Sequence, residues 1–236
     1  QLVAIENELM RVTFTTKGGQ PKLVELKQYK GRDSNWVKMA GTDFDNIGYL
    51  ISTSANTTAN TQDLYFSKID SSINADGSKT VSFTLNSDSS GAEAITHRFT
   101  VKPGDYMLDF TVDMKGAGQL LPQGTMNLSW QYAAVQQESD ISYERTNTQV
   151  GFVQDGDFDY YTAGKRSSKE FSQPVNWLGV RQRFFYTILV ARNKFSRGNW
   201  EWTMPSDSAH TIIRSTAKMQ LSVAQGATAS VPFSIY

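Results

Sequence analysis

The sequence contains two histidines and no cysteine, so few of its side chains could act as a base or a nucleophile near neutral pH. His97 shares its strand parity with Ile95, Phe99 and Val101, which predicts that its ring faces the interior or lies at a sheet edge. His210 lies beside a serine-rich turn, at the start of a predicted strand. A lone inward-facing histidine is more often a hydrogen-bonded core residue than a ligand, and we expect this of His97.

Three carboxylates, Asp155, Asp157 and Asp159, alternate along the chain in a pattern with some likeness to a cation-binding loop. The glutamate that completes a calcium loop is missing, so a solvated loop is the better interpretation. The sequence also lacks a Gly-x-Ser-x-Gly elbow and a glycine-rich phosphate loop. Without cysteine it has no thiol chemistry, disulfide or Cys-ligated metal. We therefore expect no catalytic residue, no metal site and no cofactor.

The numbers of basic and acidic residues limit the kinds of partner that this chain can bind through its charge. Lysine plus arginine and aspartate plus glutamate both number 23, which gives a formal net charge of zero. Nucleic-acid binding through phosphates relies on a basic excess, so this class of partner is excluded. No run approaches the ~18 consecutive apolar residues that suggest a membrane-spanning helix. The chain of 236 residues is long enough to bury a sizeable core without disulfides.

Alternation of apolar and polar residues with a period of two dominates the chain, which is typical of half-buried strands. Glycine and proline turns separate these runs, as at Lys17-Gly18-Gly19. Many short strands joined by turns predict an all-β fold, an antiparallel sandwich with little helix. The expected strands lie at residues 10–15, 23–26, 80–85, 108–114, 126–132, 200–203, 211–214, 219–223 and 231–235.

The polar segments 52–63 and 154–173 are predicted to be surface loops, because they are rich in small and polar residues. Helix is expected only as a turn or two near Gln182 and between residues 135 and 143. Neither loop has a composition shift strong enough to mark a domain boundary, and no internal repeat is visible. We therefore expect a single domain over residues 1–236.

Residues 176–192 form the densest aromatic stretch. We expect a strand at 177–180, one helical turn at 181–185 and a strand at 187–191 that is buried on both faces. Trp177, Phe184 and Phe185 would then plug the core. The stems of the arginines at positions 181 and 183 would pack, while their charged heads reach solvent or a carboxylate. The alternative interpretation is that these aromatic residues form a partner-binding surface.

Three segments resemble the periplasmic domain of the bacterial membrane-protein insertase YidC, in its Bacteroidetes form. The first is 3–29, with a Gly-Gly turn that leads into a Leu-x-x-Tyr strand, and the second is the hairpin 97–106. The third is 176–185, which is similar to a Trp-x-x-x-x-Gln-x-Tyr/Phe-Phe pattern. The signature residues are Gly18, Gly19, Gly104, Asp105, Tyr106, Trp177, Gln182, Phe184 and Phe185.

The resemblance implies a β-supersandwich similar to galactose mutarotase, excised from a larger bacterial inner-membrane protein, with this domain in the periplasm. It implies flanking transmembrane helices that hold the insertase chemistry and tether this domain, which would be a noncatalytic accessory module. Its partners would be components of the Sec translocon and nascent membrane proteins, reached through the full-length parent. The residues do not indicate which surface binds them.

Two other functions remain open. A carbohydrate-binding module would stack sugar rings on exposed aromatic residues, and the candidates are Trp36, Tyr160, Tyr161, Trp200 and Trp202. Positions 200 and 202 share one face of a strand, although core packing is the more common role of such a pair. A sugar mutarotase or epimerase would need an acid and a base at one anomeric carbon, and no such pair is identifiable.

Overall fold

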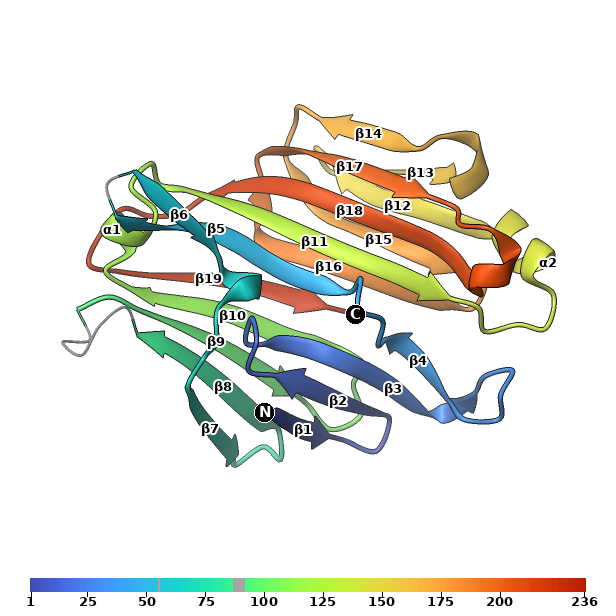
Figure 1. Ribbon diagram of the computed structural model, residues 1–236, viewed down its shortest axis with the longest axis horizontal. Coiled ribbons are helices and arrows are strands. Elements are labelled where there is room, and N and C mark those ends of the chain that lie inside the picture. The colour runs from blue at the N-terminus through green and yellow to red at the C-terminus, as the bar shows by residue number, and fades with distance from the viewer. Residues whose placement is uncertain (55, 87–91) are drawn as a thin grey trace.

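The computed structural model describes residues 1–54, 56–86 and 92–236 (Figure 1). The described residues form nineteen strands in three antiparallel sheets, with two short α-helices and three 3-10 turns. The predicted all-β, antiparallel class is confirmed. The helices are α1 (Ala117–Leu120) and α2 (Ile141–Thr146), and the 3-10 turns are η1 (Thr61–Asp63), η2 (Ala163–Lys165) and η3 (Asp207–Ala209).

The N-terminal part of the chain forms a four-stranded sheet. Its strands follow the chain order, as β1 (Leu2–Glu6), β2 (Met10–Thr15), β3 (Gln20–Lys30) and β4 (Trp36–Ala40). Gly18 and Gly19 turn the chain between β2 and β3 with φ angles of 75° and 51°, as the sequence predicts. A Cβ at Gly19 would lie 2.9 Å from the Phe66 ring, so the turn also needs glycine for close packing.

A nine-stranded sheet is the largest element of the fold. From one edge to the other its strands are β13 (Asp157–Thr162), β12 (Thr148–Gln154), β15 (Val175–Gln182), β16 (Phe185–Phe195), β19 (Thr228–Ile235), β10 (Leu108–Lys115), β9 (Ala94–Val101), β8 (Lys79–Asn86) and β7 (Lys68–Ile73). C-terminal β19 joins the two halves, because it pairs with β16 on one side and β10 on the other.

A six-stranded sheet packs on part of the inner face of the nine-stranded sheet and crosses the upper part of Figure 1. Its strands are β14 (Ser168–Phe171), β17 (Arg197–Thr203), β18 (Thr211–Ser222), β11 (Thr125–Val135), β5 (Asn46–Ser54) and β6 (Thr57–Asn60). The long β11–β18 pair lies at its centre.

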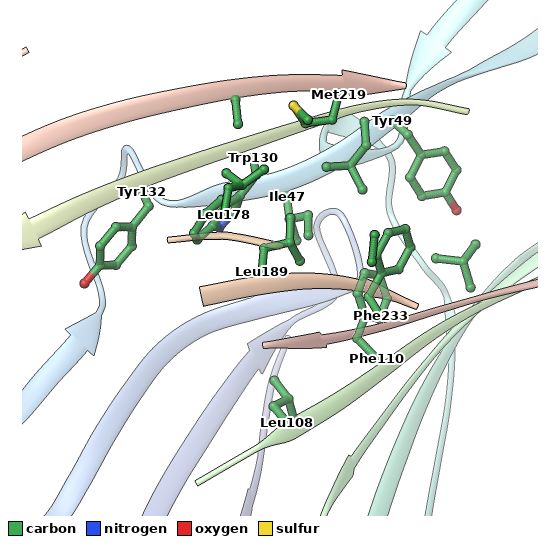
Figure 2. Close-up of a cluster of buried hydrophobic side chains, with 14 of the residues drawn as sticks. Ile47, Tyr49, Leu108, Phe110, Trp130, Tyr132, Leu178, Leu189, Met219 and Phe233 are labelled. Carbon is green, nitrogen blue, oxygen red and sulfur yellow. The ribbon is translucent and has the colours of Figure 1, made fainter. Parts of the chain in front are cut away.

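The core joins all three sheets into one cluster of buried side chains. Figure 2 shows Ile47 and Trp130 of the six-stranded sheet projecting toward Phe110 and Phe233 of the nine-stranded sheet. The four-stranded sheet contributes Phe14, whose ring centroid lies 4.8 Å from that of Phe99 and 5.8 Å from that of Phe83. Burying this many aromatic and aliphatic side chains stabilises the sandwich at roughly 25 cal/mol per Å² of apolar surface.

Several local predictions were wrong. The expected loop 154–173 contains β13, η2 and β14, and the expected loop 52–63 contains the end of β5, β6 and η1. The two strands predicted at 211–214 and 219–223 are one strand, β18. In each case pairing with a neighbouring strand outweighs a weak local preference for a loop.

Candidate functional site

A cleft of about 650 Å³ lies between the four-stranded sheet and the sandwich. Strands β2, β3 and β4 line one side, and β5, β10, β11 and β16 line the other. The buried side chains in its walls are mostly apolar or aromatic: Met10, Val12, Leu26, Met39, Ile47, Leu108, Trp130 and Tyr132. The cleft therefore suits an apolar group better than a charged or strongly polar one.

Ordinary strand alternation places these residues. Met10, Val12 and Phe14 lie on one face of β2; the first two line the cleft, and the third enters the core. On β11 the same alternation gives Trp130 and Tyr132, whose rings stack with centroids 5.9 Å apart. The cleft wall is thus an extension of the core face where the two layers separate.

Aromatic residues from all three family-like segments meet at the cleft. The ring centroid of Tyr29 lies 6.4 Å from that of Tyr106 and 5.6 Å from that of Phe185, the latter pair in an edge-on arrangement. These residues come from segments 3–29, 97–106 and 176–185. The three segments that carry the family resemblance therefore contribute aromatic residues to both sides of the cleft.

The connection between β15 and β16 differs from the predicted helical turn. The chain reverses through two residues, Arg183 and Phe184, and Arg183 adopts a left-handed φ of 44°. Phe184 is 61% exposed and lies at the cleft, so its predicted place in the core was wrong. A two-residue reversal holds the side chain at its tip away from both sheets. The Arg183 guanidinium stacks over the Phe184 ring at 4.3 Å and pairs with Glu138 at 3.3 Å.

The flanking strands also correct the predicted plug. In β16 buried residues alternate with half-buried ones, so it is not covered on both faces. Trp177 is half-buried and belongs to the outer face of the nine-stranded sheet, while its neighbour Leu178 is fully buried inside. Phe185 is half-buried and packs against the core. On β15 the side chains that enter the core are therefore Leu178 and Val180, which lie on the opposite face of the strand from Trp177.

Gln182 ends β15 and connects it to the segment around α2. Its Nε2 donates to the carbonyl oxygen of Val135 at 2.6 Å and to the Glu144 carboxylate at 3.0 Å. That carboxylate also accepts hydrogen bonds from the backbone N–H groups of Gln137 and Glu138. Burial raises the pKa of Glu144, and these hydrogen bonds oppose the shift. The signature glutamine thus holds the turn next to the cleft in place.

Asp45, one of the two carboxylates that line the cleft, accepts its hydrogen bonds from the protein itself. Its Oδ2 accepts from the backbone N–H of Gly41 at 3.0 Å and from the backbone N–H and hydroxyl of Thr42 at 2.7 and 2.8 Å. Its Oδ1 accepts from the N–H of Ala133 at 2.7 Å. These contacts tie the loop before β5 to β11, which is a structural role.

His97 is buried beneath the Gly18-Gly19 turn, which confirms the predicted core position. Its Nδ1 lies 2.8 Å from the carbonyl oxygen of Gly19, so this nitrogen carries the proton. Its Nε2 lies 2.8 Å from the Tyr49 hydroxyl and accepts a hydrogen bond from it. Burial lowers the pKa of His97 to about 4. The ring is therefore neutral near pH 7 and joins three parts of the fold.

The other residues that the sequence singled out also have structural roles. Nδ1 of His210 lies 2.8 Å from the Gln136 side-chain oxygen, outside the cleft lining. Trp200 and Trp202 are buried, so the sugar-stacking interpretation of this pair was wrong. Asp155 takes part in the reversal between β12 and β13, and the described residues contain no group of three potential metal ligands.

The remaining signature residues shape a hairpin. Gly104 has a φ of 68° in the turn after β9. The side chain of Asp105 accepts from the N–H of Met107 at 2.9 Å, and its carbonyl oxygen accepts from Asn7 Nδ2 at 2.7 Å. This last contact fastens the hairpin to the four-stranded sheet, so that Tyr106 lines the cleft. No local pattern in the sequence predicts the cleft, because its walls come from strands that are distant in the chain.

Comparison with known families gives a match over residues 2–236 to the family described as the YidC periplasmic domain. The chain is 24% identical over 222 residues to the membrane protein insertase YidC of Phocaeicola vulgatus, covering 93% of this chain and 34% of that protein. It is 26% identical over 223 residues to the same-named protein of Bacteroides fragilis, covering 91% and 34%. The chain thus spans about a third of the length of these curated relatives.

Among solved structures, the fold is similar to a galactose mutarotase-like protein from Lactobacillus casei, with a TM-score of 0.58 and 9% identity over 100% of this chain and 99% of that one. It is also similar to a galactose mutarotase-related enzyme from Lactobacillus acidophilus, with a TM-score of 0.53 and 8% identity over 100% and 96%. These likenesses identify the fold as a mutarotase-like β-sandwich, and at this identity they show the fold alone.

Proposed function

Because this chain belongs to the YidC periplasmic domain family, we propose that it is a noncatalytic accessory domain of a membrane-protein insertase. In this proposal transmembrane helices elsewhere in a longer parent chain hold the domain on the periplasmic side of the inner membrane. The domain assists insertion by binding segments of nascent membrane proteins, and it acts alone or beside components of the Sec translocon. No described helix has the length and apolar character needed to cross a bilayer.

The observation that carries this proposal is the apolar cleft. Its volume of about 650 Å³ lies in the range of ~300–1,000 Å³ typical of binding pockets. Aromatic residues line it, and aromatic side chains contribute much of the energy at interfaces because they bury large areas. The natural occupant is a short apolar stretch, which is the chemistry that a membrane-protein segment presents before insertion.

The polar groups around the cleft support binding over catalysis. Asp45 already accepts four hydrogen bonds, and Glu138 is paired with Arg183. The two histidines, His97 and His210, both lie outside the cleft lining, and each makes hydrogen bonds within the protein. A base for sugar chemistry needs a lone pair aimed at the substrate, and the side chains that could supply one either hold partners within the protein or lie outside the cleft.

A single-cysteine experiment tests cleft binding, because the natural chain has no cysteine to interfere. An environment-sensitive fluorophore on Tyr29→Cys should shift to the blue when a lysine-flanked poly-leucine peptide is added. The matched control is the same fluorophore on Ile73→Cys, at the far edge of the nine-stranded sheet. Equal responses at both positions, or none at position 29, would contradict cleft binding.

Two further measurements test the rest of the proposal. In the full-length parent, a photo-crosslinker at position 29 should capture nascent membrane proteins more often than one at position 73. Proton NMR of freshly dissolved α-galactose or α-glucose should show no faster approach to the α/β equilibrium with the domain than without it. Accelerated mutarotation would show that the domain is an enzyme.

A further inference from the structure

The outer face of the nine-stranded sheet carries a group of large apolar residues at one end. They lie on β13, β12, β15 and β16. The strand register places them on the same face, because residues paired across neighbouring strands share a face. Gly151 is paired with Tyr160 and Gly179, and Trp177 is paired with Val153 and Val190. We call this surface the aromatic face: Val153, Phe158, Tyr160, Trp177, Tyr186, Ile188 and Val190. None of these residues is fully buried, so no other part of the described structure covers the face.

The centre of the aromatic face is a hollow of about 280 Å³. Gly151 and Gly179, which face each other on β12 and β15, contribute no side chain to it. The ring centroid of Phe158 lies 5.8 Å from that of Trp177 and 6.0 Å from that of Tyr160. Phe158 is 61% exposed, Tyr160 49% and Tyr186 43%. An exposed apolar patch of this kind marks an interaction surface.

The charges beside the face are cationic. Among the described residues that line the hollow, Arg181 is the one that carries a charge, and its guanidinium lies 5.6 Å from the centre of the Tyr186 ring. Arg183 lies two residues further along the chain, at the tip of the β15–β16 hairpin over the exposed Phe184 ring, and it is paired with Glu138, so the cation available to the face is Arg181. Asp157 and Asp159 alternate with Phe158 and Tyr160 along β13, so they belong to the other face of that strand.

We propose that the aromatic face is a contact surface for a phospholipid bilayer. Tryptophan and tyrosine favour the interface between water and lipid, because their rings are apolar while their N–H and O–H groups reach water. Arginine beside them can pair with lipid phosphate. Membership in the periplasmic domain family of a membrane protein supplies the bilayer next to which such a face would lie.

The position of the face has a consequence for the cleft. Tyr186 lines both the hollow and the cleft, and Phe184 also lines the cleft. A domain that rests on lipid through the aromatic face would hold the cleft mouth close to the bilayer surface. A segment emerging from the membrane could then reach the cleft without crossing bulk water. The lipid contact itself is independent of cleft binding and is tested separately.

The test is binding of the 236-residue chain to vesicles of phosphatidylethanolamine and phosphatidylglycerol. Co-sedimentation should show binding, and replacing Phe158 and Tyr160 together by serine should weaken it by about tenfold. The matched control is Ile73→Ser, which removes an apolar residue that is 75% exposed at the opposite edge of the same sheet. It should leave vesicle binding unchanged. Arg181→Gln should weaken binding to vesicles with phosphatidylglycerol more than binding to vesicles without it.

A spectroscopic readout locates the contact. In a Trp36→Phe background, Trp177 is the most accessible tryptophan in the described structure, because Trp130, Trp200 and Trp202 are buried. Vesicles with brominated acyl chains should quench its fluorescence. No vesicle binding, or equal weakening by the control, would overturn the proposal. So would concentration-dependent dimerisation abolished by the Phe158/Tyr160 variant in the absence of lipid, or saturable binding of an oligosaccharide at this face without vesicle binding.

Discussion

The outer face of the nine-stranded sheet changes character between β19 and β16. From β8 to β19 it is covered by short hydroxyl side chains and charges, which pair across strands. The hydroxyl groups of Thr84 and Thr96 lie 2.9 Å apart, Arg98 pairs with Asp113, and Ser230 donates to Asp113 at 2.7 Å. From β16 to β13 the same face carries the aromatic residues and glycines described above.

The inner faces of the two halves do not differ in this way. Both bury aliphatic and aromatic side chains in the core that the three sheets share, including Phe99 and Phe110 in one half and Phe152 and Leu178 in the other. The fold therefore needs only the inner face. The residues of the outer face can therefore vary with what that face contacts. The polar half suits contact with water, and the aromatic half suits contact with an apolar partner.

The largest expected effect separates the two faces of one strand. Leu178→Ala should lower the free energy of unfolding by about 3–4 kcal/mol, because it leaves a cavity in the core. Trp177→Ala, one residue earlier on the outer face, should cost only about 1–2 kcal/mol in the isolated domain. Urea denaturation measures both. If the tryptophan variant lost as much stability as the leucine variant, the aromatic face would be part of the packed core.

The next largest effect is the pH dependence of stability that His97, buried beneath the polar half, should produce. The folded-state pKa of His97 is about 4, below its ordinary value of 6.5. Between these values the unfolded chain takes up a proton that the folded protein does not. The free energy of unfolding should therefore fall as the pH falls from about 6.5 to about 4, by about 3 kcal/mol in total.

The control for this pH dependence is His97→Gln, measured by urea denaturation at the same pH values. The variant should be less stable than the parent at pH 7, but it should lack this part of the pH dependence. Glu144 contributes in the opposite direction. Its pKa is raised in the folded protein, so its protonation at lower pH increases the free energy of unfolding. It is present in both proteins and cancels in the comparison. Parallel profiles for parent and variant would mean that His97 is not buried as described.

The smallest effects compare the two outer surfaces directly. Thr96→Ala removes one cross-strand hydroxyl pair and should cost less than about 1 kcal/mol. Phe158→Ser should change stability by no more than about 0.5 kcal/mol, because most of the ring is already exposed. Denaturation midpoints measure both. A loss above about 2 kcal/mol for Phe158→Ser would show that the ring stabilises the fold rather than a contact with a partner.

Much of the fold could be predicted from the sequence by itself. Period-two alternation located the strands from 10–15 to 126–132, because a strand with one buried face must place its apolar residues at every second position. The Gly18-Gly19 and Gly104 turns were predictable since a left-handed backbone favours glycine. The parity of His97 with its apolar neighbours predicted a ring that faces inward or lies at a sheet edge, and the ring is buried. These properties depend on a residue and its near neighbours in the chain.

Other features were decided only by the tertiary structure. Arg183 and Phe184 form a two-residue reversal because β15 and β16 pair up to Gln182 and Phe185, which leaves no room for the helical turn that the local sequence favoured. The same pairing placed Trp177 on the outer face and Leu178 in the core. The cleft exists because Tyr29, Tyr106 and Phe185, far apart in the chain, are brought together by strands of different sheets. Sequence periodicity tells which side chains share a face, whereas which faces meet, and which stay open, depends on the packing of the whole chain.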